Sequence, residues 1–272
     1  MSTARDLLAL VLLLGATVLG ALWLPATWID DNVVDEDGFL AITVPLAEDP
    51  EFQRLLSDSA VQEILGGDRL PDWLQERLTP LAEEQAEKLT DTDVYGTLWG
   101  ASMAELHHAL FTPGASELDV DLAPAIDRIL TPVEERLPID IPRPEDATVT
   151  LATVPDVPLL TALSAVTPWA HWAGPAALVL LVLALILGAH RRTLLVLAGL
   201  GGILAGAAVW WLGTRIGTVV PDAVDQAVFL GPIVREFESR FQTAMAPQGI
   251  ILLGAGALVT AAGVVLMGLH RR

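Results

Sequence analysis

The chain has 272 residues, no cysteine and a formal net charge of −19 at pH 7. Without cysteine it holds no disulfide, and its acidic balance argues against a nucleic-acid partner. Hydrophobic residues make up 53% of the sequence, and many of them lie in long uncharged runs. This pattern indicates a membrane protein rather than a water-soluble one.

Four runs contain no charged residue: 7–24, 173–189, 193–214 and 249–269. Each is about long enough to cross a hydrocarbon core of roughly 30 Å as a helix. The sequence therefore predicts an all-α transmembrane bundle of four helices. It also predicts an extracytoplasmic α+β domain, with three to four helices and two short strands, inserted between the first and second spans.

Five segments follow from this prediction. They are the cytoplasmic N-terminus with the first span (1–24), the acidic extracytoplasmic domain (25–170), the hairpin of the second and third spans (171–214), an extracytoplasmic amphipathic helix (215–248), and the fourth span with the cytoplasmic C-terminus (249–272).

Basic and aromatic residues predict the orientation. The short segments on one side of the spans carry Arg5, Arg191, Arg192, Arg271 and Arg272. Lys and Arg favour the cytoplasmic side, and tryptophan settles at the interfaces. Six of the eight tryptophans lie at the opposite span ends: Trp23, Trp28, Trp169, Trp172, Trp210 and Trp211. We expect a multi-pass plasma-membrane protein with both termini in the cytoplasm.

The first run has two interpretations. At eighteen residues it is longer than the usual hydrophobic region of a signal peptide, and residues 22–26 offer only a weak cleavage site. We expect it to stay in the protein as a membrane anchor, with a cleaved signal peptide as the alternative.

The insert carries 29 acidic and 7 basic residues, a net charge of −22. Most of these acids are expected to keep an exported domain soluble. Residues 30–38 resemble a calcium loop in composition, but Val34 breaks the alternation of ligands that an EF-hand needs. We predict no metal site and no cofactor, with cation binding by the acidic residues left open.

Hydrophobic spacing predicts the elements of the insert. A short extended piece uses Phe39, Ile42, Val44 and Leu46. Helices are expected over about 50–65, 71–89, 91–111 and 124–137, and strands over 117–122 and 148–154. Since a helix separates the strands, parallel pairing is preferred. Residues 222–245 are predicted to form an amphipathic helix that docks on the insert.

The chain then shows a resemblance. The segments that carry it are TVPLAEDPEFQ (43–53), LWGASMAELHHALF (98–111), LDVDLAPAIDRI (118–129), ATVTL (147–151) and the HRR turn (190–192). Their order resembles uncharacterised four-helix integral membrane proteins of high-GC Gram-positive, or actinobacterial, bacteria over nearly the whole chain. The resemblance implies a fold and a compartment, and supplies no activity or functional residues.

Catalytic signatures are not found in the sequence. It has no Walker loop, no Gly-x-Ser-x-Gly elbow and no His-Glu-x-x-His, and the glycines at 199–202 lie inside a span. His107 and His108 are adjacent, so on a helix they diverge too far to bind one ion readily. We expect no enzyme, and a histidine pair that is partly buried or solvated.

Small residues at four-residue spacing are the candidate interaction sites. They are Ala16 and Gly20, Gly202 and Gly206, and Ala257 and Ala261. Such spacing lets membrane helices approach closely. The ordinary interpretation is packing among the chain's own helices. The alternative is a face for a homo-oligomer or another membrane subunit.

Three functions remain open. The first is a non-enzymatic accessory or scaffold protein with a membrane or envelope protein as partner, besides the lipid bilayer itself. The second is an extracytoplasmic ligand-sensing receptor component, and the third is a channel or permease subunit. The third is disfavoured because the interiors of the spans lack ionisable residues, which proton and ion pathways use.

Overall fold

The computed structural model describes residues 2–50, 53, 93–112, 116–121, 148–154, 158–218 and 230–269. They belong to two compact units. Unit 1 comprises Met1–Val34, Leu163–Asp225 and Val234–Arg272, and unit 2 comprises Asp35–Ala162 and Gln226–Ile233.

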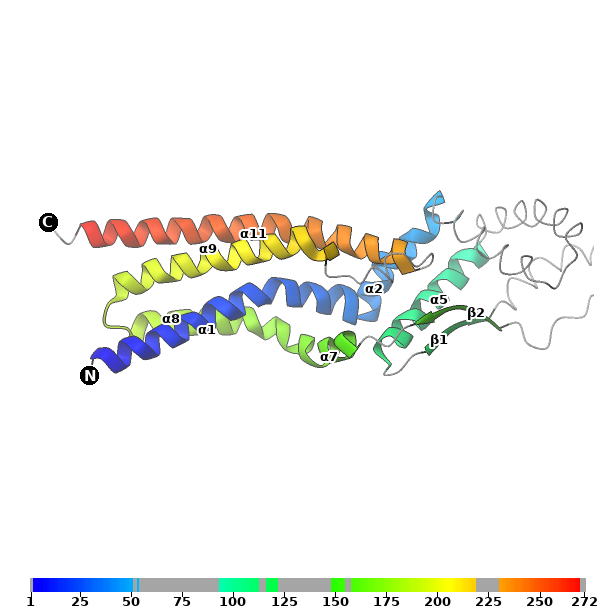
Figure 1. Ribbon diagram of the computed structural model, residues 1–272, viewed down its shortest axis with the longest axis horizontal. Helices are drawn as coiled ribbons and strands as arrows, with labels where there is room; N and C mark the ends of the chain where they lie inside the picture. Colours follow the sequence, from blue (N-terminus) through cyan, green and yellow to red (C-terminus); the bar gives the residue numbers. More distant parts are fainter. Residues whose placement is uncertain are drawn as a thin grey trace, which may run out of the picture. The chain divides into compact units, whose positions relative to one another are not determined.

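Unit 1 is a bundle of long helices, labelled in Figure 1. They are α1 (Ser2–Ile29), α8 (Ala170–Leu187), α9 (Arg191–Arg215) and α11 (Leu230–Gly268). Among the described residues these give four helices long and apolar enough to cross a membrane, as predicted. The start of α1, the end of α11 and the α8–α9 turn lie at the same end of the bundle (Figure 1).

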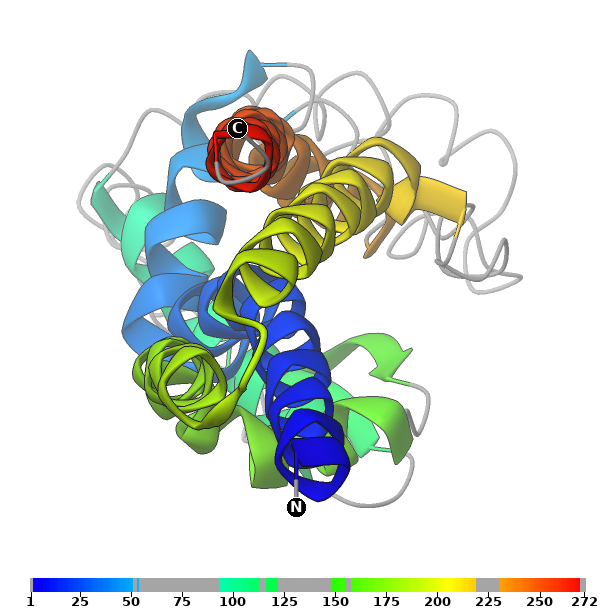
Figure 2. The same ribbon diagram turned by 90° about the vertical axis from the view of Figure 1, so that its left-hand side faces the viewer.

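The view along the bundle shows its order (Figure 2). Helix α1 lies beside α8, and α9 lies between α1 and α11. The α1–α8 contact is built around Ala9, Leu13 and Ala184, to which α9 adds Leu194. Large apolar side chains such as those of Leu178 and Leu258 are exposed on the outer faces. This arrangement suits lipid as the surrounding solvent.

Two helices are longer than expected because proline does not end them. Pro25 lies inside α1, which continues to Ile29 and into a π-helical turn, η1 (Asp30–Val34), so the helix extends beyond the uncharged run 7–24. Pro247 lies inside α11, so the expected amphipathic helix and the fourth span form one helix. Proline removes one backbone hydrogen bond, and packing of Met245 and Gly249 against α9 on either side supports the continuous helix.

The segment 222–245, which is predicted to dock on the insert, divides between the two units where the structure describes it: residues 230–233 belong to unit 2, and residues 234–245 belong to unit 1. Phe241 and Met245 form a buried cluster with Val209 of α9. The Trp28 ring of α1 packs edge-on against the ring of Phe241, with their centroids 4.9 Å apart. The part of the segment around Phe241 and Met245 therefore packs on the other long helices.

Unit 2 contains a small aromatic core. Helices α2 (Glu36–Thr43) and α5 (Asp93–Phe111) bury Phe39, Ile42, Trp99 and Met103. The indole nitrogen of Trp99 donates a hydrogen bond of 2.9 Å to the backbone oxygen of Thr43. The bond ties the end of α2 to the middle of α5, and α5 ends at the residue predicted.

The extended piece predicted around 39–46 is wrong. These residues form α2 and a 3-10 turn, η2 (Val44–Glu48). The Asp35 side chain caps α2 by accepting a 3.0 Å hydrogen bond from the backbone nitrogen of Gly38. Glu36 and Asp37 in the first turn favour the helix dipole. Phe39 and Ile42 are both buried, and their spacing places them on one face of α2.

Strands β1 (Ser116–Asp121) and β2 (Thr148–Val154) pair antiparallel, with Ser116 opposite Val154 and Asp121 opposite Thr148. The preference for parallel pairing is therefore wrong, because alternation identifies a strand without giving its direction. The register shifts between Leu118 and Asp119. The helices predicted over 71–89 and 124–137, and nearly all of the one over 50–65, lie outside the described residues, so the α+β class of the whole insert stays a prediction.

The chain re-enters unit 1 through α7 (Pro158–Val166) and a 3-10 turn, η3 (Thr167–Trp169), which lead directly into α8. Beyond α9 lies a further 3-10 turn, η4 (Ile216–Thr218). The turn η3 positions the first residues of α8.

Candidate functional site

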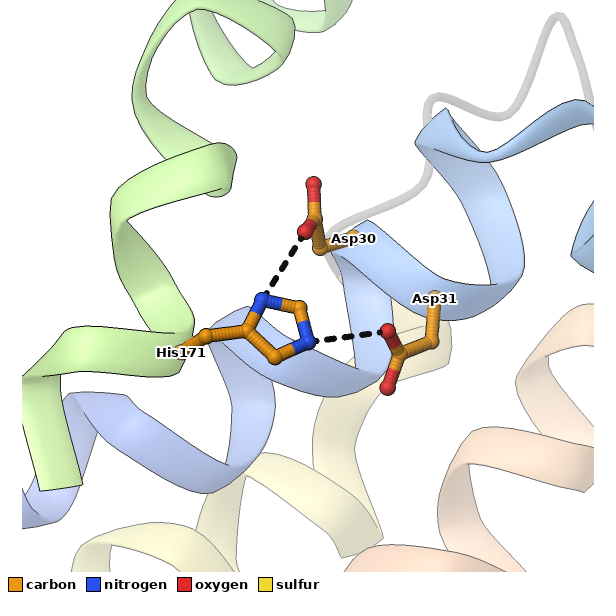
Figure 3. A group of neighbouring side chains, drawn as sticks. All are labelled: Asp30, Asp31 and His171. Atoms are coloured by element: carbon orange, nitrogen blue, oxygen red, sulfur yellow. Dashed lines mark ion pairs between the residues drawn. The ribbon is translucent and has the colours of Figure 1, made fainter.

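Three ionisable side chains of unit 1 come together where α1 passes into η1 and where α8 begins (Figure 3). The ring of His171 lies between two carboxylates. Its Nδ1 is 3.3 Å from Oδ2 of Asp30, and its Nε2 is 3.2 Å from Oδ1 of Asp31. We call these three residues the Asp-Asp-His cluster.

Local structure explains how consecutive aspartates reach one imidazole. Asp30 and Asp31 open the π-helical turn, which is wider than an α-helical turn. Asn32 anchors that turn by donating a 2.9 Å hydrogen bond from its side chain to the backbone oxygen of Trp28. His171 lies in the first turn of α8, directly after η3. The packing of α1 on α8 then brings the two ends together.

The cluster is unevenly exposed. The Asp30 side chain is 17% exposed, whereas those of Asp31 and His171 are 58% and 54% exposed. A neutral imidazole has one N–H and one lone pair. With a carboxylate oxygen near each ring nitrogen, one carboxylate of the neutral cluster faces the lone pair. Carboxylate oxygen and imidazole nitrogen are also the groups that bind transition-metal ions.

A second polar cluster joins the other ends of α1 and α8. The carboxylate of Asp6 accepts a 2.9 Å hydrogen bond from the backbone nitrogen of Ala189, and its other oxygen lies 3.1 Å from Nδ1 of His190. Arg5 donates to the backbone oxygen of Leu187 at 3.1 Å. This cluster has a single carboxylate, that of Asp6, which accepts a hydrogen bond from a backbone amide. Its contacts therefore fix the start of α1 to the end of α8.

The predicted pair Gly202 and Gly206 lies at the α9–α11 contact. A Cβ atom added at Gly202 would lie 3.1 Å from the Cα of Gly256, and one added at Gly206 would lie 2.7 Å from the backbone oxygen of Gly249. The second distance is too short for any side chain. The close approach of the two backbones therefore requires glycine here.

The other predicted small residues occupy different environments. Ala16 is buried, and Gly20 is half-buried with open space at its missing Cβ. Ala257 and Ala261 are both exposed on α11. The α11 residues that contact α9 closely are Gly249, Gly256 and Gly263, which sequence reasoning missed. Their signal was a seven-residue spacing, which also returns to one helix face.

The histidine pair on α5 separates as helical geometry predicts. His107 is buried, and its ring lies between Phe39 and Phe111 with centroid distances of 5.1 and 4.8 Å. His108 is exposed. The described residues hold no group of three potential ligands around either histidine.

His171 is the functional candidate that sequence reasoning missed. Trp169 and Trp172 flank it, and Trp28 precedes Asp30, so all three members of the cluster stand next to tryptophans assigned to one interface. Side chains at one membrane depth on neighbouring helices are candidates for contact. That shared depth was the available signal.

The four apolar helices place this chain among multi-pass helical membrane proteins. No protein-family model, curated protein or solved structure matches it. Further functional assignment therefore depends on the residues themselves.

Proposed function

We propose that this chain is a non-enzymatic accessory or scaffold subunit of the plasma membrane, which binds another membrane or envelope protein. The observation that carries the proposal is the chemistry of the long helices. The uncharged runs within them contain no ionisable residue, and α9 and α11 meet through glycine. Tight backbone packing without charged groups suits a structural bundle better than an ion or proton pathway.

The orientation belongs to the same proposal. We place both termini and the α8–α9 turn in the cytoplasm because Arg5, Arg191 and Arg192 lie at that end. The insert then lies outside the cell as an acidic α+β domain.

The resemblance to four-helix membrane proteins of actinobacteria supports this compartment. A partner inside the bilayer would contact the exposed apolar faces, where Leu178 of α8 is 62% exposed and Leu258 of α11 is 74% exposed. The partner is either a different protein or a second copy of this chain.

Site-specific photo-crosslinking in native membranes tests the proposal. A benzophenone side chain replaces Leu178 or Leu258 in separate variants, and a third variant carries it at Leu194, which is 4% exposed. We expect a protein adduct of one defined mass from at least one exposed position and none from the buried control. An adduct of twice the chain mass identifies a homo-oligomer.

Two results would overturn the scaffold role. One is the absence of protein adducts from every lipid-facing position scanned along α1, α8, α9 and α11. The other is solute or ion flux through vesicles that contain only this chain, lost when helix-packing residues are changed. The second result would establish a channel or permease instead.

A further inference from the structure

We propose that the Asp-Asp-His cluster is a binding site for a divalent transition-metal ion of the zinc type, held by Asp30, Asp31 and His171. Each residue offers one ligand atom, and the three atoms lie within 4.8 Å of one another. The proposal is independent of the scaffold role, since the site lies at the helix ends and uses none of the exposed apolar faces.

The distances suit a tetrahedral ion. Zinc binds imidazole nitrogen and carboxylate oxygen at about 2.0–2.2 Å, so two ligands on one tetrahedral zinc lie about 3.4 Å apart. The two short contacts use different nitrogens of His171, since Nδ1 lies 3.3 Å from Asp30 and Nε2 lies 3.2 Å from Asp31. One ion takes one of these nitrogens, so side-chain rotation has to bring the three ligand atoms from within 4.8 Å of one another to that spacing, and water completes the coordination.

The donor set selects the kind of metal. Calcium and magnesium prefer oxygen ligands alone, whereas imidazole suits zinc, copper, iron and nickel. One imidazole nitrogen together with two carboxylate oxygens therefore favours a transition metal over the alkaline-earth ions. The charge agrees, because two carboxylates and a neutral imidazole total −2, and among the described residues neither aspartate pairs with lysine or arginine.

The two sides of the site come from segments far apart in the sequence. Asp30 and Asp31 lie a few residues before the segment 35–162 of unit 2, and His171 lies a few residues after that segment. A bound ion would cross-link the end of α1 to the start of α8, and so fix the two chain segments between which unit 2 is inserted. A metal at this position stabilises the helix pair whenever the ion is present.

Zinc titration of the full chain in lipid nanodiscs tests the site. Competition with a chromophoric chelator, at physiological salt, measures the affinity and stoichiometry of wild type and variants. The acidic residues of the insert also attract cations, so the difference between wild type and His171→Gln is the measured quantity. We expect His171→Gln to remove one zinc ion per chain and Asp31→Asn to weaken its binding by about tenfold or more.

The cluster at the opposite helix ends provides the matched control. His190 lies 3.1 Å from a single carboxylate, that of Asp6, so His190→Gln changes the same residue type without removing a three-ligand set. We expect zinc binding in that variant to equal wild type. Equal binding by wild type and His171→Gln would overturn the proposal.

Cobalt substitution gives a second readout that does not depend on affinity. A Co²⁺ ion in a site of low coordination number gives visible absorption bands far stronger than those of the hydrated ion. We expect these bands with wild type and His190→Gln and their loss with His171→Gln. Zinc should also raise the midpoint of thermal unfolding of wild type, and magnesium at the same concentration should not. A spectrum of hydrated Co²⁺ alone with wild type would contradict the site.

Discussion

The internal packing of unit 1 and that of unit 2 differ in the size of the side chains that they bury. In unit 1 small residues face each other across α9 and α11, while large apolar side chains such as Leu258 are exposed. In unit 2 large side chains such as Trp99 and Met103 are buried. Lipid removes the hydrophobic driving force between helices, so close backbone contact has to replace it. Four substitutions test this difference.

The largest effect is expected in unit 2. Trp99 is 4% exposed and donates a hydrogen bond to the Thr43 backbone, so Trp99→Ala leaves a cavity and an unpaired oxygen. We expect a loss of about 3–5 kcal/mol in the unfolding free energy of unit 2. Hydrogen exchange should show weaker protection in α2 and α5, with unit 1 unchanged.

An exposed tryptophan gives the control for that experiment. Trp169 is 72% exposed, and Trp169→Ala should leave exchange in α2 and α5 at the wild-type level. Equal effects of the two substitutions would mean that aromatic burial does not distinguish unit 2.

The second test adds one methyl group to the glycine contact of unit 1. A Cβ atom at Gly256 would lie 2.7 Å from the backbone carbon of Gly202, so Gly256→Ala has to push α9 and α11 apart. Overpacking of this kind costs about 1–3 kcal/mol. The measurement is the midpoint of thermal unfolding in detergent.

Gly254 lies on the same helix, two residues away, and no atom of the described residues lies within 4 Å of its missing Cβ. Gly254→Ala should be neutral or slightly stabilising, since alanine favours a helix. A lower midpoint for Gly254→Ala than for Gly256→Ala would show that close approach does not hold this helix pair.

Sequence reasoning located the long helices because uncharged runs report directly on the surrounding solvent. Of the small residues it selected, Gly202 and Gly206 lie at the contact with α11, whereas Ala257 and Ala261 lie on the exposed side of α11. Small residues occur on both sides of that helix. Only the position of α9 shows that Gly249, Gly256 and Gly263 form the contact.

The local differences have two causes. Ile42, Val44 and Leu46 alternate like a strand, but the cap provided by Asp35 starts a helix there. Helices α1 and α11 continue through Pro25 and Pro247 beyond the uncharged runs, because tertiary packing supports them. Tertiary contacts also decide the meeting of His171 with Asp30 and Asp31.

The third test concerns the polar contacts that supplement helix packing in unit 1. Asp6→Asn weakens the acceptor for the Ala189 amide and removes the charge facing His190. We expect a fall in the thermal midpoint smaller than that of Gly256→Ala, with faster hydrogen exchange at Ala189. His190→Gln retains the backbone bond and should have less effect. If Asp6→Asn exceeds Gly256→Ala, the helix ends rather than the glycine contact dominate the stability of unit 1.

The smallest effect is expected at Tyr95 in unit 2, where it appears only at high pH. Burial raises the pKa of Tyr95 above its ordinary value of 10.0, and its buried hydroxyl has no hydrogen-bond partner among the described residues. The unfolded chain therefore loses this proton at lower pH than the folded chain. The contribution of Tyr95 to stability is complete below about pH 10 and is lost as the pH rises through the folded pKa.

Tyr95→Phe removes an unpaired hydroxyl, so at pH 7 we expect a change of about 1 kcal/mol or less, neutral or stabilising. Unfolding of unit 2 followed between pH 9 and about pH 11 should show a smaller loss of stability in the variant than in wild type. Parallel pH profiles would mean that the Tyr95 hydroxyl is in contact with water. The aromatic core of unit 2 would then be less tightly packed than the α9–α11 contact of unit 1, where only glycine fits.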